Sequence, residues 1–152
     1  MRILGLAVLV ALTATIASCK KSPMAPSPAT VAGTWRATRA EFVSVTNPAL
    51  KVEVVSRGTT IVLVLDSAGS FTYTLTDPGT AAAVYTGTWR TSTLDGAPAL
   101  ALTWLTGLFG SAEFKMTLSG DTLTISGGHV PYDVDPNVQF EETILNMTLA
   151  RQ

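Results

Sequence analysis

The sequence contains very little cysteine, histidine and charge. Of its 152 residues one is Cys and one is His, and charged side chains make up only 14%. A single Cys has no partner for a disulfide within the chain. A Ser-His-Asp hydrolase would need His129 as its general base, and no nucleophile motif accompanies this His. We therefore expect no enzymatic activity and no cofactor.

The chain also lacks a basic patch. From residue 22 onward it contains seven Lys and Arg residues against eleven Asp and Glu residues. Proteins that bind nucleic acid neutralise phosphates with clustered cations. This acidic balance therefore argues against a nucleic-acid partner.

The apolar run near the N-terminus is shorter than the roughly 20 residues that a membrane-spanning helix needs. It begins after Arg2, extends from Ile3 to Leu12, and is followed by small residues. A basic start, an apolar core and a small-residue end are typical of a secretory signal peptide. We therefore interpret residues 1–18 as a signal peptide.

The end of this segment, Ile16-Ala17-Ser18-Cys19, resembles the lipobox of bacterial lipoproteins. The resemblance implies that Cys19 becomes acylated and anchors the protein to a membrane of the bacterial cell envelope. The alternative is a secreted protein with a chance Cys, although a lone thiol is unusual in an oxidising compartment. Lys20 stands where Asp retains lipoproteins of enteric bacteria at the inner membrane, which favours the outer membrane.

The segment that follows Cys19 is rich in proline. Residues 20–30 read KKSPMAPSPAT, with three Pro residues. Such a composition continues neither a helix nor a central strand. We expect residues 19–31 to form a disordered tether, and residues 32–152 to form one folded domain, which we take to be a monomer.

Alternation of apolar and polar residues is the dominant pattern of the folded part. It predicts eight strands, joined mainly by short turns, at residues 34–45, 59–66, 70–76, 83–91, 99–104, 112–118, 122–126 and 140–150. Sequential strands with one apolar face cover that face by closing into a barrel or splitting into a sandwich. We predict an all-β fold, an eight-stranded antiparallel up-and-down barrel. Residues 47–58 fit a short helical or 3₁₀ excursion better than a strand.

The stretches AGTWRAT (32–38), GSFTYTLTDPG (69–79), YTGTWRTS (85–92) and LSGDTLTISGG (118–128) together resemble the lipocalin-like domains of bacterial lipoproteins. The resemblance implies an eight-stranded barrel that often binds a small hydrophobic molecule. Gly33 and Trp35 match the family's first-strand signature. Arg151 is the candidate for the Arg that packs over this Trp. The alternative is that Trp35 is simply a core aromatic residue.

An eight-stranded barrel holds either packed side chains or one small ligand. Alternation places the candidates for a ligand cavity inside the barrel: Phe71, Tyr73, Tyr85, Trp89, Trp104, Phe114 and Met116. By alternation, Arg39 and Glu41 fall on the same face of the strand as Trp35 and would also point inward. Charges there are costly unless they are paired or partly hydrated. A wet cavity explains these two residues. A β-bulge that reverses the faces of the strand is the alternative.

Two segments between the predicted strands leave alternatives open. The apolar cluster at 102–110 is either a rim for ligand or membrane contact or a buried barrel end. The polar loop at 127–142 contains Asp133, Asp135 and Asn137, which match the start of a calcium loop. The loop lacks the Gly and Glu that complete this motif, so we expect a solvated loop and no metal site.

The sequence thus favours a lipid-anchored protein whose barrel binds a small apolar or amphipathic molecule. The alternative is a structural or interaction lipoprotein with a filled barrel that acts through a surface partner. An empty, sizeable interior would favour the first, and a solid interior the second.

Overall fold

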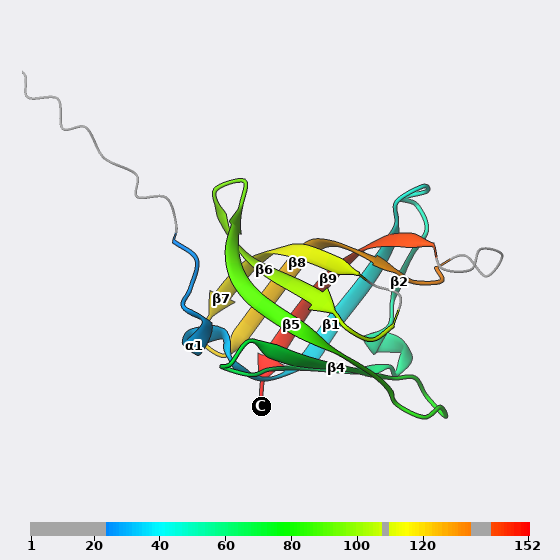
Figure 1. Cartoon of the computed structure of the whole chain (residues 1–152). Helices are drawn as coiled ribbons and strands as arrows, with labels where there is room; N and C mark the ends of the chain where they lie inside the picture. The colour runs from blue at the N-terminus through cyan, green and yellow to red at the C-terminus, as the bar shows by residue number, and fades with distance from the viewer. Residues whose placement is uncertain (1–23, 108–109, 135–140) are drawn as a thin grey trace, which may run out of the picture.

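The computed structural model describes residues 24–107, 110–134 and 141–152. The predicted signal peptide and Cys19 lie outside these residues, as do Asp135, Asn137 and the pair 108–109. In the described part, one helical turn precedes nine strands and a single 3₁₀ turn. Figure 1 shows the strands curving around a common axis, with the helical turn at one end.

The sheet closes into the predicted barrel. Its strands are β1 (Gly33–Ser44), β3 (Thr60–Leu65), β4 (Ser70–Thr76), β5 (Ala83–Leu94), β6 (Ala97–Trp104), β7 (Ser111–Ser119), β8 (Thr122–Pro131) and β9 (Glu142–Arg151). Each pairs antiparallel with its neighbour in this order, and β9 pairs with β1 along most of their lengths. The prediction of an eight-stranded antiparallel barrel is therefore confirmed.

Three segments differ most from the sequence-based expectation. Residues 47–58 hold both a short strand, β2 (Lys51–Glu53), and a 3₁₀ turn, η1 (Val55–Arg57). The N-terminal part of the predicted 127–142 loop instead extends β8 to Pro131, after a register shift between Ile125 and Gly128. The helical turn α1 (Pro28–Val31) lies within the predicted tether and buries Val31, so the folded part begins before residue 32.

A β-bulge in β1 decides which side chains enter the barrel. The register against β9 shifts between Ala37 and Arg39. Before the shift Ala37 is buried, whereas after it Ala40 and Phe42 are buried instead. The inserted residue reverses the two faces of the strand.

The interpretation that Arg39 and Glu41 point into the barrel is therefore wrong, and the bulge alternative is correct. Arg39 Nη2 lies 2.9 Å from Glu41 Oε2, in an ion pair whose Arg side chain is 62% exposed. On the outer surface the two charges stay hydrated, so no wet cavity is needed to explain them.

The α1 end of the barrel is closed by Trp35, which is fully buried. Its indole Nε1 donates a hydrogen bond to the Val31 carbonyl at 2.9 Å. The guanidinium of Arg151 lies 4.2 Å from the centre of the ring and also donates to the carbonyls of Ala32 and Thr30. The contact that the resemblance implied for Arg151 is thus present, and it ties the last strand to α1.

Gly33 stands at the start of this arrangement. Its φ is +147°, and a Cβ there would lie 2.5 Å from Arg151 Nη1. A larger residue would therefore strain the backbone and displace the guanidinium from Trp35.

The opposite end of the barrel is shaped by Glu53, which fastens η1 to β1. Its Oε1 accepts hydrogen bonds from the backbone N–H groups of Ala40 and Val55, and its Oε2 accepts one from Ser56. Partial burial raises the pKa of Glu53, but these hydrogen bonds outweigh it and lower the pKa from 4.5 to about 2. The ionised carboxylate therefore holds the 3₁₀ turn in place.

We expect Glu53→Gln to lower the free energy of unfolding at neutral pH by about 1 kcal/mol, a value reduced because solvent screens the carboxylate. The folded-state pKa is depressed, so this stabilisation is complete above pH 4.5 and is lost as the pH falls through about 2. The difference between wild type and variant should shrink across that range in urea titrations. The matched change Glu41→Gln, which removes only a surface ion pair, should have little effect.

Candidate functional site

The inside of the barrel has a packed half and a hollow half. The packed half adjoins α1 and contains fully buried aliphatic side chains around Trp35, including Leu63, Leu100, Leu123 and Leu149. The hollow half contains a cavity of about 580 Å³ that is partly open to solvent. This volume is within the range of ~300–1,000 Å³ that is common for small-molecule sites.

The walls of the cavity are mainly apolar. Six aromatic residues contribute: Phe42, Tyr73, Tyr85, Trp104, Phe114 and Tyr132. Aliphatic side chains complete the walls, namely Leu75, Ala83, Leu102, Val130, Pro131, Leu145 and Met147. The remaining lining residues are Gly107 and two acids, Asp77 and Asp133. A mostly apolar cavity with a few polar groups is the usual form of a ligand site.

Aromatic contacts set the shape of the cavity. The rings of Phe42 and Tyr132 are stacked, with centroids 3.8 Å apart and an interplanar angle of 14°. Tyr73 and Tyr85, which are paired across β4 and β5, have centroids 6.1 Å apart. These side chains come from both sides of the barrel, so the cavity has rigid aromatic walls.

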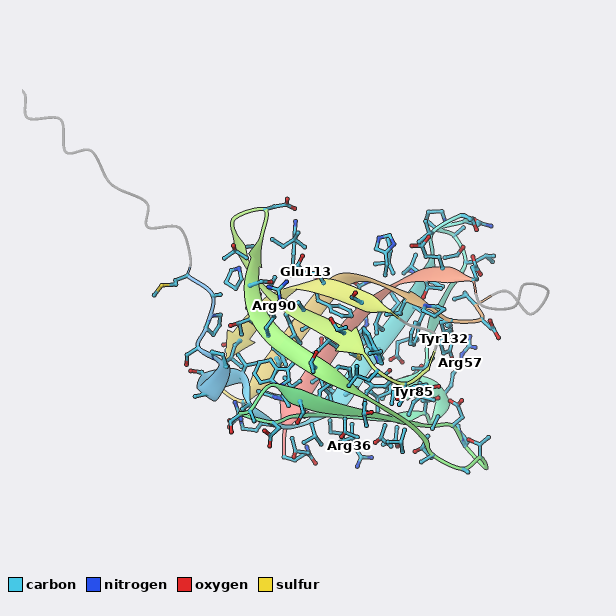
Figure 2. All side chains as sticks on the ribbon, in the orientation of Figure 1. Arg36, Arg57, Tyr85, Arg90, Glu113 and Tyr132 are labelled. Atoms are coloured by element: carbon cyan, nitrogen blue, oxygen red, sulfur yellow. The ribbon has the colours of Figure 1, made fainter. Side chains whose placement is uncertain are left out.

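The phenol groups of Tyr73 and Tyr132 stay neutral at physiological pH, because their pKa values are raised. Burial is the main cause that raises the pKa of Tyr73, and the neighbouring Tyr132, Tyr85 and Asp77 raise it further. Burial and the charge of Asp77 also raise the pKa of Tyr132, while Arg57 opposes them. Figure 2 shows Arg57, Tyr85 and Tyr132 together at the end of the barrel away from α1. The phenols of Tyr73 and Tyr132 therefore act as neutral hydrogen-bonding groups.

The structure separates the candidate cavity residues into three groups. Tyr73, Tyr85, Trp104 and Phe114 line the cavity. The other inward-facing candidates, Phe71, Trp89 and Met116, are buried in the core and do not line it. Arg39 and Glu41 lie outside the barrel, as described above.

Several lining residues were missed by the sequence analysis. Phe42 was missed because simple alternation from Trp35 places it on the outer face, and the bulge precedes it. Val130 was placed in a loop, although β8 extends to Pro131, and Tyr132 follows directly after the end of this strand. The polar His129 beside the apolar Val130 was the available sequence signal of a continuing strand. In the structure His129 is exposed and Val130 is buried.

The segment 102–110 contributes to the rim of the cavity. Trp104 and Gly107 line the cavity, and Leu105 is 73% exposed. Leu105 thus does not belong to a buried barrel end, whereas Leu102 is buried, and Leu108 and Phe109 lie outside the described residues. In the predicted 127–142 loop, His129 Nδ1 and Glu142 Oε1 form a surface hydrogen bond at 2.7 Å. No cluster of three or more His, Cys, Asp or Glu side chains that could hold a metal occurs among the described residues.

Comparison with family models and with curated proteins gave no relative. No family model matches the chain, and no curated protein matches it significantly. Among the helices in the described residues, none is long and apolar enough to cross a membrane. The function must therefore be argued from the cavity itself.

Proposed function

We propose that the protein is a lipid-anchored lipoprotein of the bacterial cell envelope whose barrel binds one small hydrophobic or amphipathic molecule. The cavity of about 580 Å³ carries this proposal. A barrel that served only as a rigid scaffold would gain stability by filling this space, because interiors are normally packed without large voids. The hollow half favours ligand binding over a filled barrel that acts through a surface partner.

The position of the cavity suits an anchored protein. In this proposal the acyl chains on Cys19 lie upstream of α1, which packs against Trp35 at the closed end. The cavity opens at the other end, beside η1 and Tyr132. The anchor would leave this opening free to receive a molecule from the aqueous compartment.

Decanol is a suitable test ligand because it combines an apolar chain with one uncharged polar group. We expect saturable binding of one molecule per chain by isothermal titration calorimetry. Leu145→Trp places a larger ring on the cavity wall and should weaken this binding at least tenfold, which corresponds to about 1.4 kcal/mol. Circular dichroism establishes that the variant is folded.

The matched control is Leu105→Trp, which makes the same change at a residue that is 73% exposed and does not line the cavity. Its affinity for decanol should equal that of the wild type. Equal loss of binding in both variants, or no loss in either, would mean that decanol binds elsewhere.

A further inference from the structure

We infer that the preferred ligand of the cavity is a cationic amphiphile, a small molecule with an apolar body and an amine or quaternary ammonium group. This inference rests on the proposed function and specifies its ligand class. Three features carry it: the sign of the lining charges, the environment of Asp77 and the aromatic walls.

The charge of the cavity lining is entirely negative. Among the lining residues Asp77 and Asp133 are acidic, and none is Lys, Arg or His. Arg57 is close enough to oppose the effect of these acids on Tyr132, but it is exposed and does not line the cavity. A cation entering the cavity would therefore be attracted, and an anion would meet like charges.

Asp77 has the geometry of an acceptor for a ligand. It follows directly after β4, and its Oδ1 accepts a hydrogen bond from the Thr59 hydroxyl at 2.6 Å, which fixes the carboxylate. Within the described residues it forms no ion pair, and its Oδ2 accepts no hydrogen bond. This oxygen is therefore available to a donor on a bound molecule, and a charge-assisted hydrogen bond to an ammonium group is stronger than one to a neutral donor.

The aromatic walls supply the second attraction. A cation is attracted to the face of a Tyr or Trp ring when it lies within about 6 Å of the ring centroid, and more strongly when it is desolvated. Tyr73, Tyr85 and Tyr132 bring three phenol rings to the same half of the cavity as Asp77. A cationic group bound here could thus contact both the carboxylate of Asp77 and the faces of the neighbouring Tyr rings.

Tyr73 adds an unused polar group that faces the ligand. Its side chain lines the cavity and is only 6% exposed. Across the described ranges its hydroxyl has no hydrogen-bond partner. A phenol hydroxyl both donates and accepts hydrogen bonds, and a ligand that carries a polar head beside Asp77 would supply a partner.

The test compares three ligands that share one chain and differ only in the head group: decylammonium, decanol and decanoate. Calorimetry at neutral pH and low salt should rank decylammonium first, about tenfold tighter than decanol, with decanoate weakest. Asp77→Asn keeps the hydrogen bond from Thr59 and removes the charge. It should abolish most of the preference for decylammonium over decanol.

The matched control is Asp66→Asn, at an exposed Asp in the turn between β3 and β4 that does not line the cavity. It should retain the full preference. Equal affinities for the three ligands, or tightest binding of decanoate, would overturn the cationic preference while decanol binding still supported the proposed function. Loss of all three ligands from the wild type would reject both.

Discussion

Replacing Trp35 with alanine is expected to lower the free energy of unfolding by about 3–5 kcal/mol, the usual cost of truncating a large buried aromatic residue. The indole is fully buried, and its N–H group donates to Val31. It also provides the face on which Arg151 rests. Since small domains are stable by only about 5–15 kcal/mol, the variant should lie near the limit of folding.

Guanidinium denaturation followed by circular dichroism measures this loss. Trp104→Ala is the matched control, because it makes the same change at a half-buried residue that lines the cavity. We expect the control to lose less than half as much stability, since one side of Trp104 faces open space. Equal losses would contradict the division of the interior into a packed and a hollow half.

A methyl group at Gly128 is expected to destabilise the barrel by about 1–3 kcal/mol, the usual cost of overpacking. A Cβ at this position would overlap the ring of Phe114, which lies directly over the glycine. Phe114 is itself fully buried and lines the cavity. The substitution should therefore push the ring toward the cavity and weaken decanol binding as well.

The second change Phe114→Leu should relieve this overlap. In a double-mutant cycle we expect the pair to be more stable than the sum of the single changes by at least about 0.5 kcal/mol. Gly87→Ala serves as the comparison, because its Cβ would overlap the Thr103 carbonyl of the neighbouring strand as well as Phe71. Phe114→Leu should give Gly87→Ala no relief, and the absence of coupling at Gly128 would refute the packing described here.

The order and number of the barrel strands could be predicted from the sequence, because alternation and turn residues are local signals. Alternation counted from Trp35 did not predict which side chains of β1 enter the barrel, because the sequence analysis did not place the bulge. A signal was nevertheless present, since Arg39 and Glu41 alternate with the apolar Ala40 and Phe42. Two charged residues on the face of β1 that was expected to point inward indicated that the bulge reverses the two faces of the strand.

The position of the cavity along the barrel axis was beyond a single-sequence argument. Alternation tells which face a side chain occupies, and it therefore grouped Phe71 and Trp89 with Tyr73 and Tyr85. The structure separates these pairs by their position along the axis: the first pair does not line the cavity, whereas the second does. Whether a cavity remains inside the barrel depends on the stagger of the strands and on the summed volume of the inward side chains. The alternation of apolar and polar residues gives no information on either.

The methionine methyl groups provide the most direct test of ligand binding inside the barrel. Met147 lines the cavity, Met116 is buried without lining it, and Met24 is 89% exposed. In protein labelled with ¹³C at the Met methyl groups, decanol should shift the Met147 signal in a saturable way and leave those of Met116 and Met24 in place. Met147→Leu identifies the signal. A response at Met24 alone, or no change at Met147 at saturating decanol, would contradict the proposal that the cavity is a ligand site.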